Sequence, residues 1–332
     1  MIGNLSPFML LLLPFSATMD GHGPQDPEIP TIPAANVDGT LIDLGELDAR
    51  LTVKVDVGLK GPYNFIIDTG AERTVVSREL AGVLRLAPGN PVTITSMSGT
   101  ARVNTVVVPD LSITTIGQLH TVIAPALFAR NLGAAGLLGI DTLRNHQVSI
   151  DFERGTMAVR PSEKRKKYER RDPNEIVVTA KSQFGQLIVT DAYYGNTRIQ
   201  VVLDTGSQVT MGNGALRRRI GNRAGKPQPI QLTSVTGEQT MAAYTFVPDI
   251  KVGDVAFGSM PVAFADVKPF ERFGLTERPA LLLGMDSLRS FRRVDIDFPN
   301  RQVRFLLPKG TARQSYFNTP PLPGAGGFPS KP

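Results

Sequence analysis

The chain of 332 residues contains no cysteine and no tryptophan, and its only histidines are His22, His120 and His146. Without cysteine, the protein can form neither disulfides nor thiolate metal sites. No two histidines have the spacing of paired metal ligands, so a zinc site or a histidine-based triad is hard to build. We therefore expect no metal and no cofactor, and any catalysis must rely on other side chains.

Long apolar runs are also missing. Residues 8–15 (Phe-Met-Leu-Leu-Leu-Leu-Pro-Phe) precede the small residues 16–18, a pattern that resembles the core and cleavage region of a secretory signal. The run is well short of the roughly 20 residues that span a bilayer, so no stable membrane span is expected. We expect a signal-like leader over residues 1–20 and a periplasmic or secreted protein. Because no Lys or Arg precedes the run, the alternative is an apolar leader without an export function.

Positive charge is only in modest excess over negative charge. The formal net charge is +6, and much of it comes from the basic run of residues 164–171. This run has no apolar face, which predicts a linker over residues 161–174. No nucleic-acid partner is expected, although binding of nucleic acid by this run is an alternative. Pro- and Gly-rich composition predicts a further linker over residues 21–34 and a disordered tail over residues 309–332.

Three apolar residues run into Asp-Thr-Gly twice, at residues 65–70 (Phe-Ile-Ile-Asp-Thr-Gly) and 201–206 (Val-Val-Leu-Asp-Thr-Gly). Each apolar run predicts a buried strand, and each Gly predicts a tight turn. A carboxylate at the end of a buried strand is costly when it is isolated. Two such carboxylates in matching contexts indicate that Asp68 and Asp204 are each other's partners.

Other landmarks recur in the same order, and the spacing between copies grows slowly along the chain, as expected after a duplication with loop insertions. The pairs are Ser-Met-Ser-Gly at 96–99 with Ser-Val-Thr-Gly at 234–237, Val-Pro-Asp at 108–110 and 247–249, and Leu-Leu-Gly at 137–139 and 282–284. Short strands and little helical periodicity predict an all-β fold. We expect two small β-barrel-like lobes with short helices, over residues 35–160 and 175–308, related by a pseudo-two-fold axis.

Such an axis would bring Asp68 and Asp204 together. Two carboxylates in contact cannot both ionise easily, so they share a proton. One can then act as a base on water while the other acts as an acid toward a peptide group. This chemistry hydrolyses amides without metal, cysteine or histidine.

These motifs resemble the retropepsin-like, or retroviral-type, aspartic proteases, in a form with two lobes in one chain. The resemblance covers residues 35–160 and 175–308, and the lobe size points to bacterial exported members. It implies an aspartic endopeptidase with Asp68 and Asp204 as catalytic residues and an extended peptide or protein as substrate. It also implies a monomer, because both halves are present in one chain.

The resemblance assigns supporting roles position by position. Thr69 and Thr205 would hydrogen-bond across the axis, and Gly70 and Gly206 would allow the turns to approach the dyad. Glycines would lie at the flap tips, and apolar strands would brace the turns. These residues are Gly99 and Gly237 for the flaps, and Leu137, Leu138, Gly139, Leu282, Leu283 and Gly284 for the strands.

The residue after the Gly differs between the halves, being Ala71 in the first and Ser207 in the second. A hydroxyl donated by Ser207 would favour the ionised form of Asp204, so that Asp68 would more often hold the proton. Asp141 and Asp286, which follow the Leu-Leu-Gly motifs, are expected to cap short helices.

Two alternatives remain open at this point. The halves could pair between chains rather than within one, as an obligate dimer that loses activity on dilution. Alternatively, the chain could be a non-catalytic module that binds or scaffolds peptides with the same fold.

Overall fold

The computed structural model describes residues 42–43, 51–162, 174–309 and 316–318. The predicted leader, the linker at 21–34, most of the basic linker and most of the tail lie outside these residues. No helix in the described part of the chain is long and apolar enough to cross a membrane.

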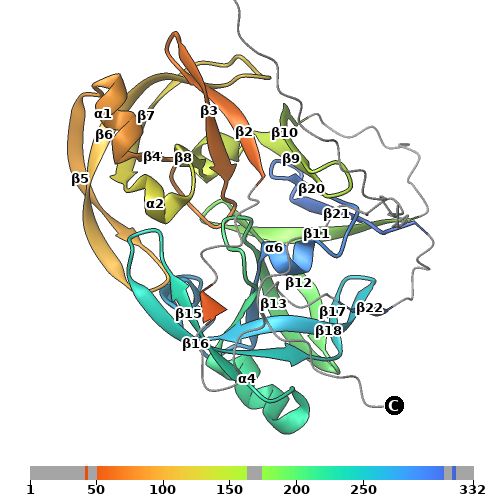
Figure 1. The fold of residues 1–332 in the computed structure, drawn as a ribbon. Coiled ribbons are helices and arrows are strands. Elements are labelled where there is room, and N and C mark those ends of the chain that lie inside the picture. The colour runs from red at the N-terminus through yellow and green to blue at the C-terminus, as the bar shows by residue number, and fades with distance from the viewer. Residues whose placement is uncertain (1–41, 44–50, 163–173, 310–315, 319–332) are drawn as a thin grey trace, which may run out of the picture. The chain divides into compact units, whose positions relative to one another are not determined.

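The first half closes into a barrel of six strands (Figure 1, orange to yellow). Along the ring, β2 pairs with β3, β3 with β8, β8 with β4, β4 with β7, β7 with β6, and β6 with β2 again. These strands are β2 (Thr52–Val57), β3 (Lys60–Ile67), β4 (Val75–Ser77), β6 (Thr100–Ile113), β7 (His120–Leu127) and β8 (Gly136–Leu138). Beside the ring are β5 (Pro88–Thr95) and the helices α1 (Arg78–Leu84), α2 (Ala129–Leu132) and α3 (Ile140–Leu143).

The second half repeats the ring with β12, β13, β19, β14, β18 and β17 in that order (Figure 1, green to blue). The strands are β12 (Gln186–Tyr194), β13 (Thr197–Leu203), β14 (Met211–Gly212), β17 (Ile250–Val252), β18 (Val255–Phe264) and β19 (Ala280–Leu283). Beside it are β15 (Gln228–Thr233), β16 (Gln239–Val247), α4 (Gly214–Ile220), the 3-10 helix η2 (Gly221–Arg223), α5 (Lys268–Arg272) and α6 (Met285–Leu288). The predicted all-β fold with two β-barrels and short helices is confirmed.

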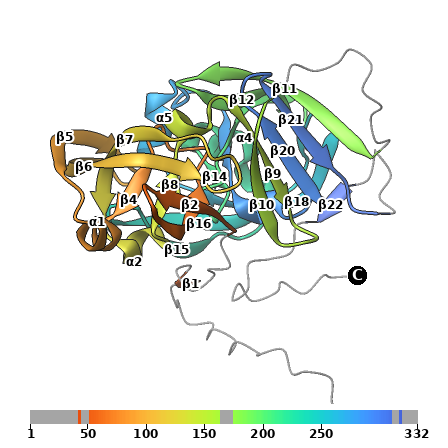
Figure 2. The ribbon, with the colours of Figure 1, turned by 90° about the horizontal axis from the view of Figure 1, so that it is seen from above.

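A sheet to which both halves contribute joins the barrels (Figure 2). Its order is β11–β21–β20–β9–β10, from β9 (His146–Asp151), β10 (Thr156–Pro161), β11 (Glu175–Gln183), β20 (Arg293–Asp297) and β21 (Gln302–Leu306). At its centre β9 and β20 run antiparallel, with Ile150 opposite Val294. Both of these side chains are fully buried, because alternate residues of β9 face the core. The hydrophobic core therefore continues from one half into the other.

Two short strands near the ends of the described chain both pair with strands of the second half. β1 (Ile42–Asp43) belongs to the predicted first lobe but pairs in parallel with β15 of the second half. β22 (Tyr316–Asn318) lies in the predicted disordered tail but pairs in parallel with β18. In both cases a segment of two or three residues adds to a strand of the second half. Its backbone groups then hydrogen-bond to that strand and no longer to water.

Candidate active site

The two Asp-Thr-Gly turns begin where β3 and β13 end. Backbone N–H of Asp68 donates to the carbonyl of Leu138 at 3.0 Å, and that of Asp204 donates to Leu283 at 3.1 Å. These carbonyls belong to β8 and β19, which run parallel to β3 and β13. The Leu-Leu-Gly strands thus lie directly beside the strands that carry the aspartates.

Threonines join the two turns to each other across the pseudo-two-fold axis. The Thr69 N–H donates to Thr205 Oγ1, and the Thr205 N–H donates to Thr69 Oγ1, both at 3.1 Å. Each hydroxyl also donates to the strand of the other half, Thr69 to Leu203 O at 2.9 Å and Thr205 to Ile67 O at 2.6 Å. All four groups are buried. Because the hydrogen bonds are reciprocal, neither turn can shift without the other.

The glycines of the turns leave room for the aspartate of the opposite half. A Cβ on Gly206 would lie 2.2 Å from Asp68 Cγ, and a Cβ on Gly70 would lie 2.6 Å from Asp204 Oδ1. These separations are far below ordinary van der Waals contact, so any larger residue would displace a carboxylate. The two aspartates are therefore packed against opposing turns.

Each carboxylate accepts two backbone hydrogen bonds from its own turn. Asp68 Oδ1 accepts from Gly70 and Ala71, both at 2.9 Å. Asp204 Oδ1 accepts from Gly206 and Ser207 at 3.1 and 3.2 Å. Burial, and secondly the charge of Asp68, raise the pKa of Asp204 to about 7.

The predicted role of the Ser207 hydroxyl is wrong. Ser207 Oγ donates to Val209 O at 2.8 Å within its own turn, and its backbone N–H, which Ala71 supplies equally in the first half, is the group that reaches the carboxylate. The hydroxyl therefore adds nothing to the ionised form of Asp204. The raised pKa of Asp204 belongs to the coupled pair, so it favours one proton shared between Asp68 and Asp204.

A second layer of side chains supports each turn from behind. Thr74 donates its N–H and Oγ1 to Asp141 Oδ1 at 2.8 and 2.7 Å, while its Oγ1 accepts from Gly139 N at 3.1 Å. Thr210, Asp286 and Gly284 repeat this arrangement in the second half. Burial raises the pKa of Asp286 to about 6.

The predicted helix-capping role of Asp141 and Asp286 is wrong in its main part. The N-cap positions of α3 and α6 are Gly139 and Gly284, without a side-chain cap. The carboxylates do accept from the next backbone N–H, but their other hydrogen bonds hold the segment after each Asp-Thr-Gly turn. A Cβ on either N-cap glycine would lie within 2.6 Å of that segment's backbone, which explains the Gly of Leu-Leu-Gly.

Sequence reasoning missed Gln186, the first residue of β12. Its side chain is buried, and its Nε2 donates to the carbonyl of Gly70 in the turn of the other half. Its Oε1 accepts no hydrogen bond in the described structure. Gln186 lines the same cleft as the aspartates. No motif marks it, because the residues that it contacts are distant in sequence.

Two β-hairpins, β5–β6 and β15–β16, meet at their tips (Figure 1) and line the same cleft as the aspartates. The β5–β6 tip carries Gly99, and the β15–β16 tip carries Gly237, which has φ 89°. Ser98 Oγ donates to a carboxylate oxygen of Glu238 and lies 3.2 Å from Ser234 Oγ, within hydrogen-bond distance. The flaps are thus hydrogen-bonded to each other at their tips.

Each flap tip also packs against the opposite half. Met97 of the first flap lies against the second-half cluster that contains Phe270 and Phe273. Val235 of the second flap lies against the first-half cluster that contains Leu127 and Leu132. The flaps therefore cross above the dyad, and an apolar side chain from each closes the cleft.

The cleft between the flaps and the turns has a volume of about 490 Å³. It is lined by both aspartates, by the flap residues Met97 and Val235, and by apolar residues of both halves, among them Val75, Leu137, Val209 and Met211. It can hold a chain between the flaps and the dyad, with apolar walls on both sides of the carboxylates.

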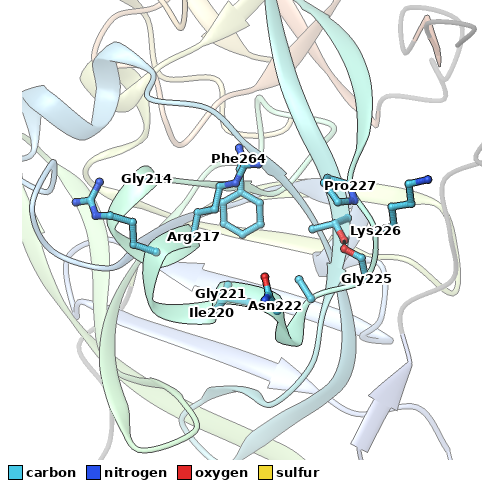
Figure 3. Close-up of a pocket in the computed structure, with 12 residues that line it drawn as sticks. Gly214, Arg217, Ile220, Gly221, Asn222, Gly225, Lys226, Pro227 and Phe264 are labelled. Atoms are coloured by element: carbon cyan, nitrogen blue, oxygen red, sulfur yellow. Dashed lines mark hydrogen bonds between the residues drawn. The ribbon is translucent and has the colours of Figure 1, made fainter.

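A separate hollow of about 650 Å³ lies beside α4 in the second half (Figure 3). Arg217, Lys226 and Phe264 are among the residues that line it. None of the repeated motif residues does so. The smaller cleft, with both aspartates, is therefore the candidate active site.

Two closed barrels, a shared sheet and one Asp-Thr-Gly turn from each half define a two-lobed acid-protease fold. Comparison with protein families agrees: residues 53–145 match the gag-polyprotein putative aspartyl proteases, and residues 190–287 match the aspartyl proteases. The chain belongs to the retropepsin-like aspartyl proteases, with two retroviral-type domains in tandem as in a duplicated protein. A comparison with curated proteins gave no match.

Proposed function

We propose that the protein is an aspartic endopeptidase in which water, activated between Asp68 and Asp204, hydrolyses a peptide bond. The observation that supports this most strongly is the reciprocal threonine hydrogen bonding, which fixes two buried carboxylates against each other's turns. A raised pKa of about 7 at Asp204 keeps one proton on the pair near neutral pH. The pair then offers one base and one acid at the same time.

In this mechanism the pair shares one proton, written here on Asp204, so that Asp68 is written as ionised. Asp68 takes a proton from water as the water oxygen attacks the carbonyl carbon, and Asp204 gives its proton to the carbonyl oxygen. The tetrahedral diol then collapses: Asp68 returns a proton to the leaving nitrogen, the C–N bond breaks, and Asp204 regains a proton from a diol hydroxyl. Both carboxyl groups end in their starting state.

The substrate would be an extended peptide or a segment of a protein. Flap strands β5 and β15 lie over the cleft, and extended chains pair with strands through main-chain hydrogen bonds. The apolar cleft walls would receive the side chains on each side of the bond that is cut.

We also propose that the protein acts as a monomer and is exported. The monomer is supported by the two turns, which come from one chain and complete the site. Export rests on the signal-like residues 1–20. Sedimentation at several concentrations and N-terminal sequencing of the protein from its native cell test these two points.

The test of the function is cleavage of a peptide library by the purified full chain between pH 3 and 8. Asp68→Asn and Asp204→Asn are the test variants, and Asp191→Asn, an exposed aspartate in β12, is the matched control. We expect the parent and the control to cut peptides and each dyad variant to lose about 10²–10⁴-fold in kcat/KM. If the parent cuts nothing but binds a transition-state mimic, a non-catalytic peptide-binding module replaces this proposal.

A further inference from the structure

Charged side chains other than the dyad line the cleft at its rim. They are Glu72, Arg73, Arg130 and Arg272. Three are cations and one is an anion, so the rim carries an excess of positive charge. How these charges are paired differs between the two halves of the cleft.

On one half, Glu72 and Arg272 neutralise each other. Arg272, at the end of α5, donates from two nitrogens to Oε1 of Glu72, which lies four residues after Asp68. The Arg272 guanidinium also lies 4.9 Å from the centre of the Phe184 ring. The pair crosses from one lobe to the other and leaves little positive charge to attract a substrate carboxylate.

The other half contains the arginine but not its partner. Arg130 lies in α2, the helix of the first half that stands between β7 and β8 as α5, with Arg272, stands between β18 and β19 of the second half. The residue that corresponds to Glu72, four positions after Asp204, is the neutral Gln208. Both Arg130 and Gln208 line the cleft. The first half therefore carries an arginine on this helix, while a neutral residue stands at the position of the anion.

Arg130 is held in place although it has no ion pair among the described residues. Its guanidinium lies 4.4 Å from the centre of the Phe128 ring, a contact that restrains the side chain without neutralising it. Glu79 is close enough to interact electrostatically with Arg130, but its carboxylate accepts from Ala129 N at 2.8 Å and does not line the cleft. The guanidinium donors thus stay available at the mouth of the cleft.

We infer that Arg130 is a specificity-determining residue that binds a carboxylate side chain of the substrate. The protease would then prefer peptides with Asp or Glu on one side of the scissile bond, a few residues from it. This inference rests on the proposed function. A planar guanidinium matches a carboxylate in two-point geometry, and the ring contact lowers the entropy lost on binding.

Arg73 is the cation that could compete for this role. Arg73 also lines the cleft and directly follows Glu72 in the chain. Its counterpart in the repeat is the buried Val209. No ring contact or ion pair within the described residues holds Arg73. A freely solvated arginine loses more entropy on binding, so Arg130 should discriminate more strongly.

The experiment compares matched peptides that differ only in Glu or Gln at each position around one cleaved bond, using the full chain. We expect one position at which Glu raises kcat/KM roughly twofold to fivefold, as for a partly exposed ion pair. Arg130→Gln should reduce this ratio to about one, and Gln208→Glu should lower it by placing a competing carboxylate in the same cleft. The matched control Arg73→Gln should keep the preference. The preference should also weaken as salt is raised.

A mirror variant tests the comparison from the opposite side. Glu72→Gln releases Arg272 and should add a preference for Glu on the opposite side of the bond. If peptides are cut but Glu is nowhere preferred, or if Arg130→Gln leaves the preference unchanged, the inference is wrong and the proposed function stands. If no peptide is cut at any pH, the proposed function fails, and the inference fails with it.

Discussion

The two halves of the molecule are nearly identical at the dyad and differ around it. Both contain the strand, the Asp-Thr-Gly turn, the reciprocal threonine and the supporting Thr–Asp pair. The differences lie in the next shell: Glu72 against Gln208, and Gln186, which reaches the first turn from the second half. Duplication thus preserved the geometry of the two turns, while residues that line the cleft around them diverged.

The largest effects should come from removing the close approach of the turns. Gly206→Ala places a methyl group where Asp68 Cγ would be only 2.2 Å away, and Gly70→Ala places one 2.6 Å from Asp204 Oδ1. A displacement of about 1 Å in the dyad costs about 10²-fold in rate, so both variants should lose at least that much kcat/KM. Gly82→Ala in α1, where a Cβ meets nothing within 4 Å, is the control and should keep full activity. Loss in only one of the two turn variants would break the symmetry of the site.

Next in size are the buried threonines. Thr69→Val keeps the shape but leaves Leu203 O and Thr205 N without their partners, and Thr205→Val does the same to Ile67 O and Thr69 N. Each buried unpaired group costs about 1–3 kcal/mol, so both variants should lower the free energy of unfolding by similar amounts. Thr→Ser at each site keeps the hydroxyl and should recover most of the loss. Denaturant titrations measure the free energy of unfolding. A Val variant as stable as the parent would show that the reciprocal threonine hydrogen bonds do not stabilise the fold.

The pH dependence tests whether the dyad shares a proton near neutral pH. Because the pKa of Asp204 is raised to about 7 in the fold, activity that needs the shared proton should fall as pH rises through about 7. The free energy of unfolding should also fall as pH rises, because the folded state binds this proton more tightly than the unfolded chain does. The contribution is therefore complete below about pH 4 and is lost as pH rises to about 7.

Asp286, with its pKa raised to about 6, contributes to stability in the same direction. Asp204→Asn should flatten the fall in unfolding free energy across this range, and Asp286→Asn should flatten only its lower part. An unfolding free energy that rises between pH 4 and 7 in the parent protein would contradict the raised pKa values.

The smallest effects should come from exchanging the residues after the glycines. Ser207 Oγ donates to Val209 O and not to the carboxylate, so Ser207→Ala should leave the acid limb of the pH–rate profile in place. Ala71→Ser, its mirror image, should also leave it in place. If either variant shifted the acid limb by half a pH unit or more, the hydroxyl would have to interact with the carboxylates after all.

The sequence contained enough to predict the dyad and the two-barrel fold, because Asp-Thr-Gly, the flap hairpin and Leu-Leu-Gly are local patterns that occur twice in one order. It could not predict contacts that depend on tertiary packing. Gln186 and Gly70 are distant in sequence, as are Glu72 and Arg272, and each pair meets only because the lobes face each other.

Local ambiguity explains the other errors. The Ser207 hydroxyl could turn either to the carboxylate or to the carbonyl of Val209, and side-chain rotamers decided this. Asp141 lies next to the position of a helix cap, but its carboxylate accepts a hydrogen bond from Thr74, which is far away in sequence. The short strand β1 carries too few residues to show which half it joins.

The central claim is that one chain supplies both catalytic aspartates, and mixing the two dyad variants tests it most directly. Full-length Asp68→Asn and Asp204→Asn would be purified, mixed at equal concentration and assayed on a peptide that the parent cuts. No cleavage is expected from either variant or from their mixture, because each molecule would still lack one aspartate. Cleavage that appears only in the mixture, near a quarter of the parent's rate, would show instead that the halves pair between chains.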